Sequence, residues 1–176
     1  MSQENTILTM PVLAVRGMVL FPNMILHFDV GRERSIKALN EAMEDDRMLF
    51  LTAQKDMRDD DPKWDEIYEV GVVAEIKQII KAKGHLRVLV EGKYRAKLIT
   101  PLERDPYLTA RIEEYPNASV RGISAKTIEA LQRTIKNSFE QYVSRSPRLT
   151  KEILFGAISV TDPLQLTEYV TSNLPI

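Results

Sequence analysis

The alternation of apolar and polar residues is clearest over residues 24–30. One face of an extended chain there would carry four apolar residues: Met24, Leu26, Phe28 and Val30. The other face would carry His27 and Asp29, and with them Ile25. This period of two predicts a strand with one buried face. Ile25 is therefore an apolar side chain on a face that is otherwise polar.

A second segment, residues 86–91, shows the same exception. Leu86, Val88 and Val90 share one face, so that Leu89 falls between Arg87 and Glu91 on the polar face. An apolar side chain in such a place is either covered by a neighbouring element or kept exposed for contact with a partner. Ile25 and Leu89 are for this reason candidate binding residues.

Further strand patterns cover residues 8–16, 48–52, 70–80, 94–99 and 107–115. The segment 48–52 is apolar almost throughout, which predicts burial on both faces. Gly84 suits a hairpin turn that needs a positive φ angle, and Gly92 predicts a bulge or corner that lets residues 94–99 bend into another edge of a curled sheet. With a single helix predicted at residues 32–45, these strands favour a pseudo-barrel over a parallel sheet, which would need helices between its strands.

The period changes from two to about 3.6 after a break at residues 116–122. A helical stripe follows: Ile128, Leu131, Ile135, Phe139 and Tyr142. Ser124 is expected to cap this long helix, residues 150–159 predict a short one, and Asp162 followed by Pro163 predicts the start of a third. The sequence thus predicts an α+β protein with a β-rich subdomain over residues 1–117 and an α-helical subdomain over residues 118–176.

Composition limits the possible partners. The net charge is −1 and there is no cysteine, so neither a strongly basic surface nor a disulfide framework is available. A local patch of Lys77, Lys81, Lys83 and Arg87 could bind nucleic acid weakly, but a solvated hairpin tip is the favoured interpretation of these residues. No apolar run reaches the ~18 residues of a membrane span, and no signal peptide precedes the first strand. We expect a cytoplasmic protein that does not enter a membrane.

The sequence offers little for catalysis. His27 and His85 belong to different strands, and no nucleophile elbow, zinc-binding helix motif or phosphate-binding loop occurs. The aspartate-rich segment at residues 54–66 lacks the ligand spacing of a calcium loop. It is interpreted as a solvated loop that Trp64 anchors, and no metal site is expected.

Several segments together resemble the N-terminal domain of Lon-type ATP-dependent proteases. They are PVLAVRGMVLFPNMILHFDVGRERSIKAL from Pro11, LTAQKD from Leu51, YEVGVVAEIKQ from Tyr68 and LRVLVEGKYRAKL from Leu86. Their order and spacing match those of that family over residues 11–112, which is far more specific than one short motif. Beyond residue 112 only the helical pattern corresponds.

The resemblance implies a PUA-like pseudo-barrel of antiparallel or mixed strands with one packed helix, followed by a helical subdomain that lacks its last helices. It also implies a non-catalytic domain that recruits unfolded or damaged protein substrates and supports the assembly of a homohexameric ring. The ATPase and the serine-lysine protease of the family lie in later domains. ATP, magnesium and catalytic residues are accordingly not expected in this chain.

The expected substrate-binding residues are those of the first apolar loop together with the two strand exceptions: Leu20, Phe21, Met24, Ile25 and Leu89. Each could instead belong to the core, or be covered by a neighbouring subunit or by the helical subdomain. A free-standing adaptor of the same fold, or a weak RNA-binding module, is the alternative function. A reading frame that continued into a phosphate-binding loop would decide against this alternative.

Overall fold

The computed structural model describes residues 7–116 and 122–174. The described elements are β1 (Ile7–Val15), β2 (Ile25–Val30), α1 (Glu33–Glu44), β3 (Met48–Ala53), the 3-10 turn η1 (Trp64–Glu66), β4 (Val70–Ala82), β5 (His85–Pro101), β6 (Thr109–Glu114), α2 (Ala125–Arg145), α3 (Lys151–Ser159) and α4 (Pro163–Ser172). They form two compact units, Met1–Asn117 and Ala118–Ile176. The predicted break at 116–122 falls largely on residues 117–121, which lie outside the described residues.

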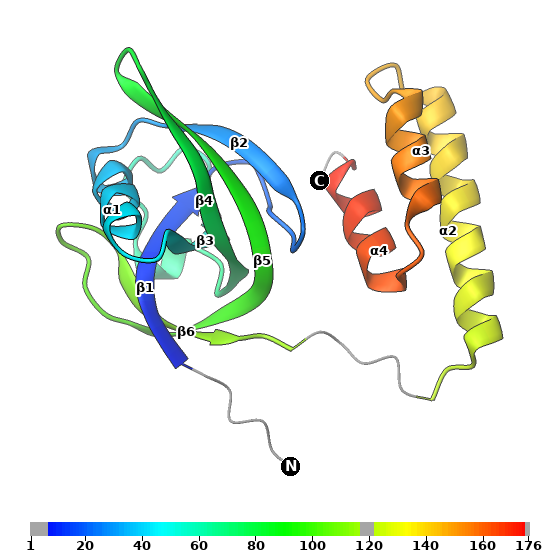
Figure 1. Ribbon diagram of the computed structural model, residues 1–176, viewed down its shortest axis with the longest axis horizontal. Coiled ribbons are helices and arrows are strands. Elements are labelled where there is room, and N and C mark those ends of the chain that lie inside the picture. Colours follow the sequence, from blue (N-terminus) through cyan, green and yellow to red (C-terminus); the bar gives the residue numbers. More distant parts are fainter. Residues whose placement is uncertain (1–6, 117–121, 175–176) are drawn as a thin grey trace. The chain divides into compact units, whose positions relative to one another are not determined.

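The strands of the first unit form one mixed sheet that closes on itself (Figure 1). The strand order is β2-β5-β4-β3-β1-β6, and an additional pairing joins β5 to β6. Only the described pair β1–β3 is parallel. Closure is possible because β5 is 17 residues long, so that its first part pairs with β2 and its last part with β6. The predicted pseudo-barrel is confirmed.

Two apolar clusters lie on opposite sides of β3. Leu49 and Leu51 face the cluster that α1 covers with Leu39, whereas Phe50 faces the cluster that β6 and the end of β5 complete. The side chains of Leu49, Phe50 and Leu51 on β3 are at most 3% exposed. The burial of β3 on both faces, predicted from its apolar run, is confirmed. Because β3 is central in the sheet and covered on both sides, a side chain on either of its faces is removed from water.

Two β-bulges shape the β4–β5 hairpin. Val73 pairs with Tyr94 but Ala74 pairs with Gly92, and Ile76 pairs with Val90 but Gln78 pairs with Leu89. One residue is therefore extra in each case: Lys93 on β5 and Lys77 on β4. The bulge predicted near Gly92 is present, and beyond it residues 96–101 pair with β6 at another edge, as predicted. A bulge bends a strand without ending its ladder, and β5 continues through it.

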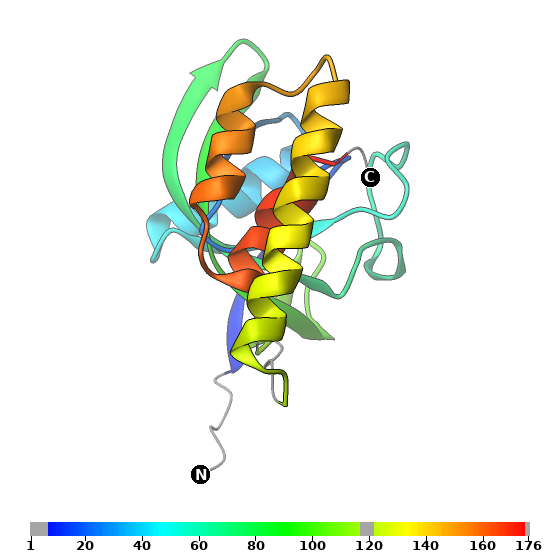
Figure 2. The same cartoon turned by 90° about the vertical axis from the view of Figure 1, so that its right-hand side faces the viewer.

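The second unit is a bundle of α2, α3 and α4 (Figure 2). Four buried residues form its core: Phe139, Val143, Ala157 and Leu166. The predicted caps are confirmed, because the Ser124 side chain accepts from the Thr127 N–H and the Asp162 carboxylate accepts from the Gln165 N–H. Each cap satisfies one of the amide groups that a helix start leaves unpaired.

Candidate functional site

The outer face of β4, β5 and β2 carries aliphatic side chains that step across the three strands. The pairing registers place residues of this face in three rows: Ile80–Arg87–Asp29, Gln78–Leu89–His27 and Glu75–Glu91–Ile25. Each row contributes one aliphatic residue, and each lies on a different strand. We call Ile80, Leu89 and Ile25 the aliphatic stripe. It is diagonal to the strands, as cross-strand neighbours two residues apart are.

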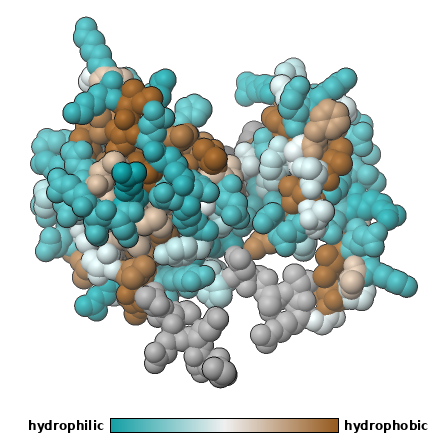
Figure 3. Space-filling view, in the orientation of Figure 1, coloured by the Kyte–Doolittle hydropathy of each residue, from teal (hydrophilic) through white to brown (hydrophobic). Residues whose placement is uncertain are grey.

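The stripe is open to solvent at both ends and half-buried in the middle. Ile25 is 65% exposed and Ile80 is 49% exposed, whereas Leu89 is of intermediate exposure. Figure 3 shows hydrophobic surface over the β4–β5 hairpin and towards β2, interrupted by hydrophilic residues. The sequence identified Ile25 and Leu89 but missed Ile80. The extra residue Lys77 turns Ile79 towards the core and Ile80 towards solvent, which alternation alone does not predict.

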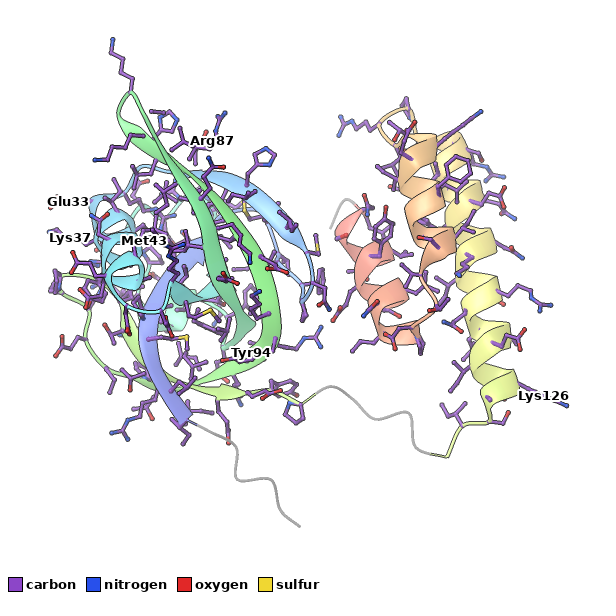
Figure 4. All side chains as sticks on the ribbon, in the orientation of Figure 1. Glu33, Lys37, Met43, Arg87, Tyr94 and Lys126 are labelled. Atoms are coloured by element: carbon purple, nitrogen blue, oxygen red, sulfur yellow. The ribbon has the colours of Figure 1, made fainter. Side chains whose placement is uncertain are left out.

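An ion pair bounds the stripe on the side of the hairpin tip, where Figure 4 shows Arg87. The Arg87 guanidinium donates to the Asp29 carboxylate, with an Nε–Oδ1 distance of 2.9 Å, and His85 Nε2 lies 3.7 Å from the same carboxylate. The hydrogen bond from Arg87 lowers the pKa of Asp29. Both groups are well exposed, so this pair contributes little stability. A partner could bind the charge of Arg87 or of Asp29 only after the two side chains had separated.

Four charges bound the stripe on its other side. Lys77 Nζ lies 2.9 Å from Glu75 and 2.7 Å from Glu91, and Lys93 Nζ lies 2.7 Å from both carboxylates. Hydrogen bonds from Lys77 and Lys93 lower the pKa of Glu75 to about 2. The two lysines are the two bulge residues, and the two glutamates are cross-strand partners. The bulges therefore place two cations between two anions, which would otherwise repel each other.

These pairings weaken the case for a nucleic-acid site. Of the four basic residues considered for such a patch, Lys77 and Arg87 already bind carboxylates. The remaining two, Lys81 and Lys83, lie at the hairpin tip. Two lysines neutralise too few phosphates for more than weak, salt-sensitive binding.

The apolar loop before β2 folds back onto the bulge at Gly92. The Asn23 N–H donates to the Gly92 carbonyl and the Gly92 N–H donates to the Met24 carbonyl, both at 2.9 Å. Leu20 is only 6% exposed and belongs to the core, so its proposed place in an exposed site is wrong. Phe21 and Met24 are of intermediate exposure. Folding of the loop over the sheet turns Leu20 inward, and the exposed apolar residue of this loop is Val19, at 56%.

Val19 lies at the rim of an apolar groove that the sequence did not predict. The groove has a volume of about 700 Å³. Tyr68 and Val70, exposed by 52% and 43%, line it with Val19, and Leu20 and Leu51 also contribute. The end of β3, the start of β4 at Val70 and the loop before β2 meet at this groove. The apolar Val19, two residues after Gly17, was a signal in the sequence, but only the fold brings it close to Tyr68.

The aspartate-rich loop is held by Trp64 and Gln54 as well as by ion pairs of Asp60 and Asp61 with arginines. Trp64 packs against the barrel cluster, as predicted. Gln54, which the sequence analysis missed, is 5% exposed. Its side-chain amide donates to the Asp56 and Asp59 carbonyls at 2.6 Å each and accepts from Arg32 at 2.8 Å.

Within residues 7–116 and 122–174 no cluster of metal-ligating side chains occurs. No helix in that part of the chain is long and apolar enough to cross a membrane.

Comparison with known proteins decides the family. The substrate-binding domain of ATP-dependent protease La (LON) matches residues 9–176. The chain belongs to this family. It is 41% identical over 174 residues to the Lon protease of Heliobacterium modesticaldum and 36% identical over 169 residues to Lon protease 1 of Bacillus subtilis. These alignments cover 98% and 96% of this chain but 21% of each relative, so the LON domain described here spans about a fifth of their length.

Solved structures of LON domains share the fold. The N-terminal domain of Mycobacterium avium complex Lon protease aligns with a TM-score of 0.59 at 19% identity, over 94% of this chain and 100% of that one. The Lon N-terminal domain protein from Xanthomonas campestris aligns with a TM-score of 0.54 at 12% identity, over 96% and 99%. At such low identity the agreement concerns the fold and carries nothing about individual residues.

Proposed function

We propose that this LON substrate-binding domain recruits unfolded or misfolded proteins through the aliphatic stripe. The observation that supports this is the position of Ile80, Leu89 and Ile25: three aliphatic side chains on one solvent face, bounded by charges that neutralise one another. Unfolded proteins share exposed apolar side chains but no common shape. A shallow apolar surface selects for that property and for little else.

The strength expected of one stripe is low. Full burial of an aliphatic side chain contributes about 1.5–3 kcal/mol, and these three are already partly buried. Association costs about 4–15 kcal/mol in lost freedom, so that a single domain would bind weakly. We propose that a homohexameric ring compensates, because several linked sites raise the effective affinity without new contacts. Weak individual contacts also allow a recruited chain to be passed on.

The rest of the reaction is assigned to the part of the parent protein beyond this domain. We propose that ATP with magnesium acts there, together with a serine-lysine endopeptidase, and that the LON domain itself performs no chemistry. Its two histidines have different surroundings: His85 Nε2 lies 3.7 Å from the Asp29 carboxylate, and His27 pairs in register with Leu89 on the outer face. Neither belongs to a nucleophile arrangement.

The test is binding of a permanently unfolded protein. Fluorescence anisotropy would follow labelled, reduced and carboxymethylated lactalbumin with the wild-type chain and with Ile25→Ser, Ile80→Ser and Leu89→Ser. We expect each substitution to weaken binding about three- to tenfold, which corresponds to ~0.7–1.4 kcal/mol.

Ile99→Ser is the matched control. Ile99 is also aliphatic, lies on β5 and is 42% exposed, but it is not part of the stripe. Its removal should leave the affinity unchanged. Equal affinity of wild type and all three stripe variants would overturn the proposal and would direct attention to the groove beside Val19 and Tyr68.

A further inference from the structure

The strand β2 pairs on one side only. Among the described strands its single partner is β5, and it stands at the end of the strand order (Figure 1). Edge strands are usually protected by proline, by lysine or by a bulge, because their unpaired amide groups attract other strands. The sequence of β2, Ile-Leu-His-Phe-Asp-Val, has neither proline nor lysine. Its one charge, Asp29, is bound by Arg87.

The hydrogen-bond phase shows which backbone groups face the open side. The Gly92 N–H donates to the Met24 carbonyl, and the β2–β5 register continues from this pair without a shift. In an antiparallel ladder, alternate pairs exchange both hydrogen bonds. Leu26, Phe28 and Val30 therefore bond to β5. The N–H and C=O groups of Ile25, His27 and Asp29 point away from β5.

A groove of about 420 Å³ adjoins the same strand. Phe28, Asp29 and Val30 line it on β2, and on β1 the lining residues are Leu13, Ala14 and Val15. Consecutive residues of a strand point to opposite faces, so a groove lined by three in succession on each strand runs along their edges. The two strands do not pair with each other in the described structure. The groove therefore lies between β1 and the unpaired edge of β2, which stands outside the part of the sheet that the β5–β6 pairing closes.

We propose that the open edge of β2 binds an extended segment of an unfolded polypeptide as an added strand. Backbone donors and acceptors at every second residue are complementary to an extended main chain. The side chain of Ile25, at the start of this edge, belongs to the aliphatic stripe, so a strand paired with β2 lies beside the surface already proposed to bind apolar side chains. This inference rests on the proposed function and names the form in which the client is held.

Strand addition combines well with low sequence selectivity. Main-chain hydrogen bonds are the same for every client sequence except at proline, and the side chains only adjust the affinity. The stripe would then favour clients with an aliphatic residue beside Ile25. Folded proteins are rejected because their backbone groups are already paired.

The experiment uses a fluorescent eight-residue peptide of alternating valine and threonine, with the full chain. Two further versions carry N-methyl groups on the amides of either the odd or the even residues. An N-methyl group removes a donor and blocks pairing on one edge only. We expect one version to lose at least tenfold in affinity, and the other, whose methyl groups face away from β2, to bind within about twofold of the parent peptide.

Hydrogen exchange gives an independent measurement. On addition of the unmodified peptide, the amides of Ile25, His27 and Asp29 should exchange at least tenfold more slowly, whereas those of Leu26 and Phe28 change little. Binding in which neither or both methylated peptides are impaired, without this alternate protection, would overturn strand addition but leave the stripe proposal standing. Absence of any peptide binding, together with unchanged binding of unfolded lactalbumin by the stripe variants, would overturn both. Alternate protection that depends on protein concentration without peptide would show that a second copy occupies the edge, which also contradicts the proposal.

Discussion

A β-carbon added to Gly92 would stand 2.4 Å from the carbonyl oxygen of Phe21. The loop before β2 and the bulge of β5 therefore meet at a distance that only glycine permits, and the two hydrogen bonds between them hold this contact. The contact couples the Phe21 loop to Glu91 and Ile25, because Glu91 adjoins Gly92 and pairs with Ile25. The shape of the proposed binding face thus depends on the absence of a side chain at Gly92.

Gly92→Ala is expected to destabilise the chain by about 1–3 kcal/mol, since a backbone carbonyl cannot yield as a flexible side chain can. Chemical denaturation measures the change in the free energy of unfolding. Gly31→Ala is the control: its added carbon would meet only His85 Cβ, at 3.9 Å, and the cost should stay within about 0.5 kcal/mol. Equal effects of the two substitutions would show that the loop is not held at Gly92.

Leu20 and Ile25 should respond oppositely to the same substitution. Leu20→Ser removes a core side chain and buries a hydroxyl, and should cost about 2–5 kcal/mol. Ile25→Ser changes an exposed position and should cost within about 0.5 kcal/mol while weakening client binding. Thermal or urea unfolding, with anisotropy on the folded variants, separates the two. A stable Leu20→Ser variant that bound clients poorly would return Leu20 to the binding site.

Gln54 should matter more to the aspartate-rich loop than the ion pairs do. Gln54→Ala leaves the Asp56 and Asp59 carbonyls and the Arg32 guanidinium without the partner that is buried between them, at a cost of about 2–4 kcal/mol. Asp61→Ala removes the exposed ion pairs with Arg34 and Arg104 and should cost less than about 1 kcal/mol. Unfolding followed by Trp64 fluorescence measures both, and a reversed order would contradict the assignment.

The cluster of Glu75, Glu91, Lys77 and Lys93 predicts a pH dependence of stability. The pKa of Glu75 falls from 4.5 to about 2 in the folded chain, so the carboxylate binds its proton more weakly when folded. The stabilisation is then complete above about pH 4.5 and is lost as the pH falls towards 2. Lys93→Met should raise the pKa of Glu75, as a carboxyl carbon NMR titration would show. Lys37→Met, which removes a lysine paired with Glu33 on α1 instead, should leave it unchanged.

The two units are expected to open separately. The helical unit has a core of four buried residues, whereas the β unit has two larger clusters. Local stability follows the amount of buried apolar contact. Native-state hydrogen exchange should therefore protect residues 72–76 and 88–90 most, and α2 to α4 less. Uniform protection across both units would contradict this.

What the sequence determined by itself is local. The period of two around Phe28 and Val88, the apolar run at Phe50 and the caps at Ser124 and Asp162 each depend on neighbours in the chain, because strand faces and helix ends are set by backbone geometry within a few residues. These features suffice for a β-rich part followed by helices and for two of the three residues of the aliphatic stripe.

Tertiary structure alone decided the rest. Ile80 reaches the outer face because Lys77 is extra relative to β5, and a bulge exists only between paired strands. Leu20 is buried because its loop folds over Gly92, where Phe21 makes a contact across 71 positions of sequence that no local pattern records. The open edge of β2 likewise depends on which strands find partners. Alternation shows which side chains share a face, and only the folded sheet shows what covers that face.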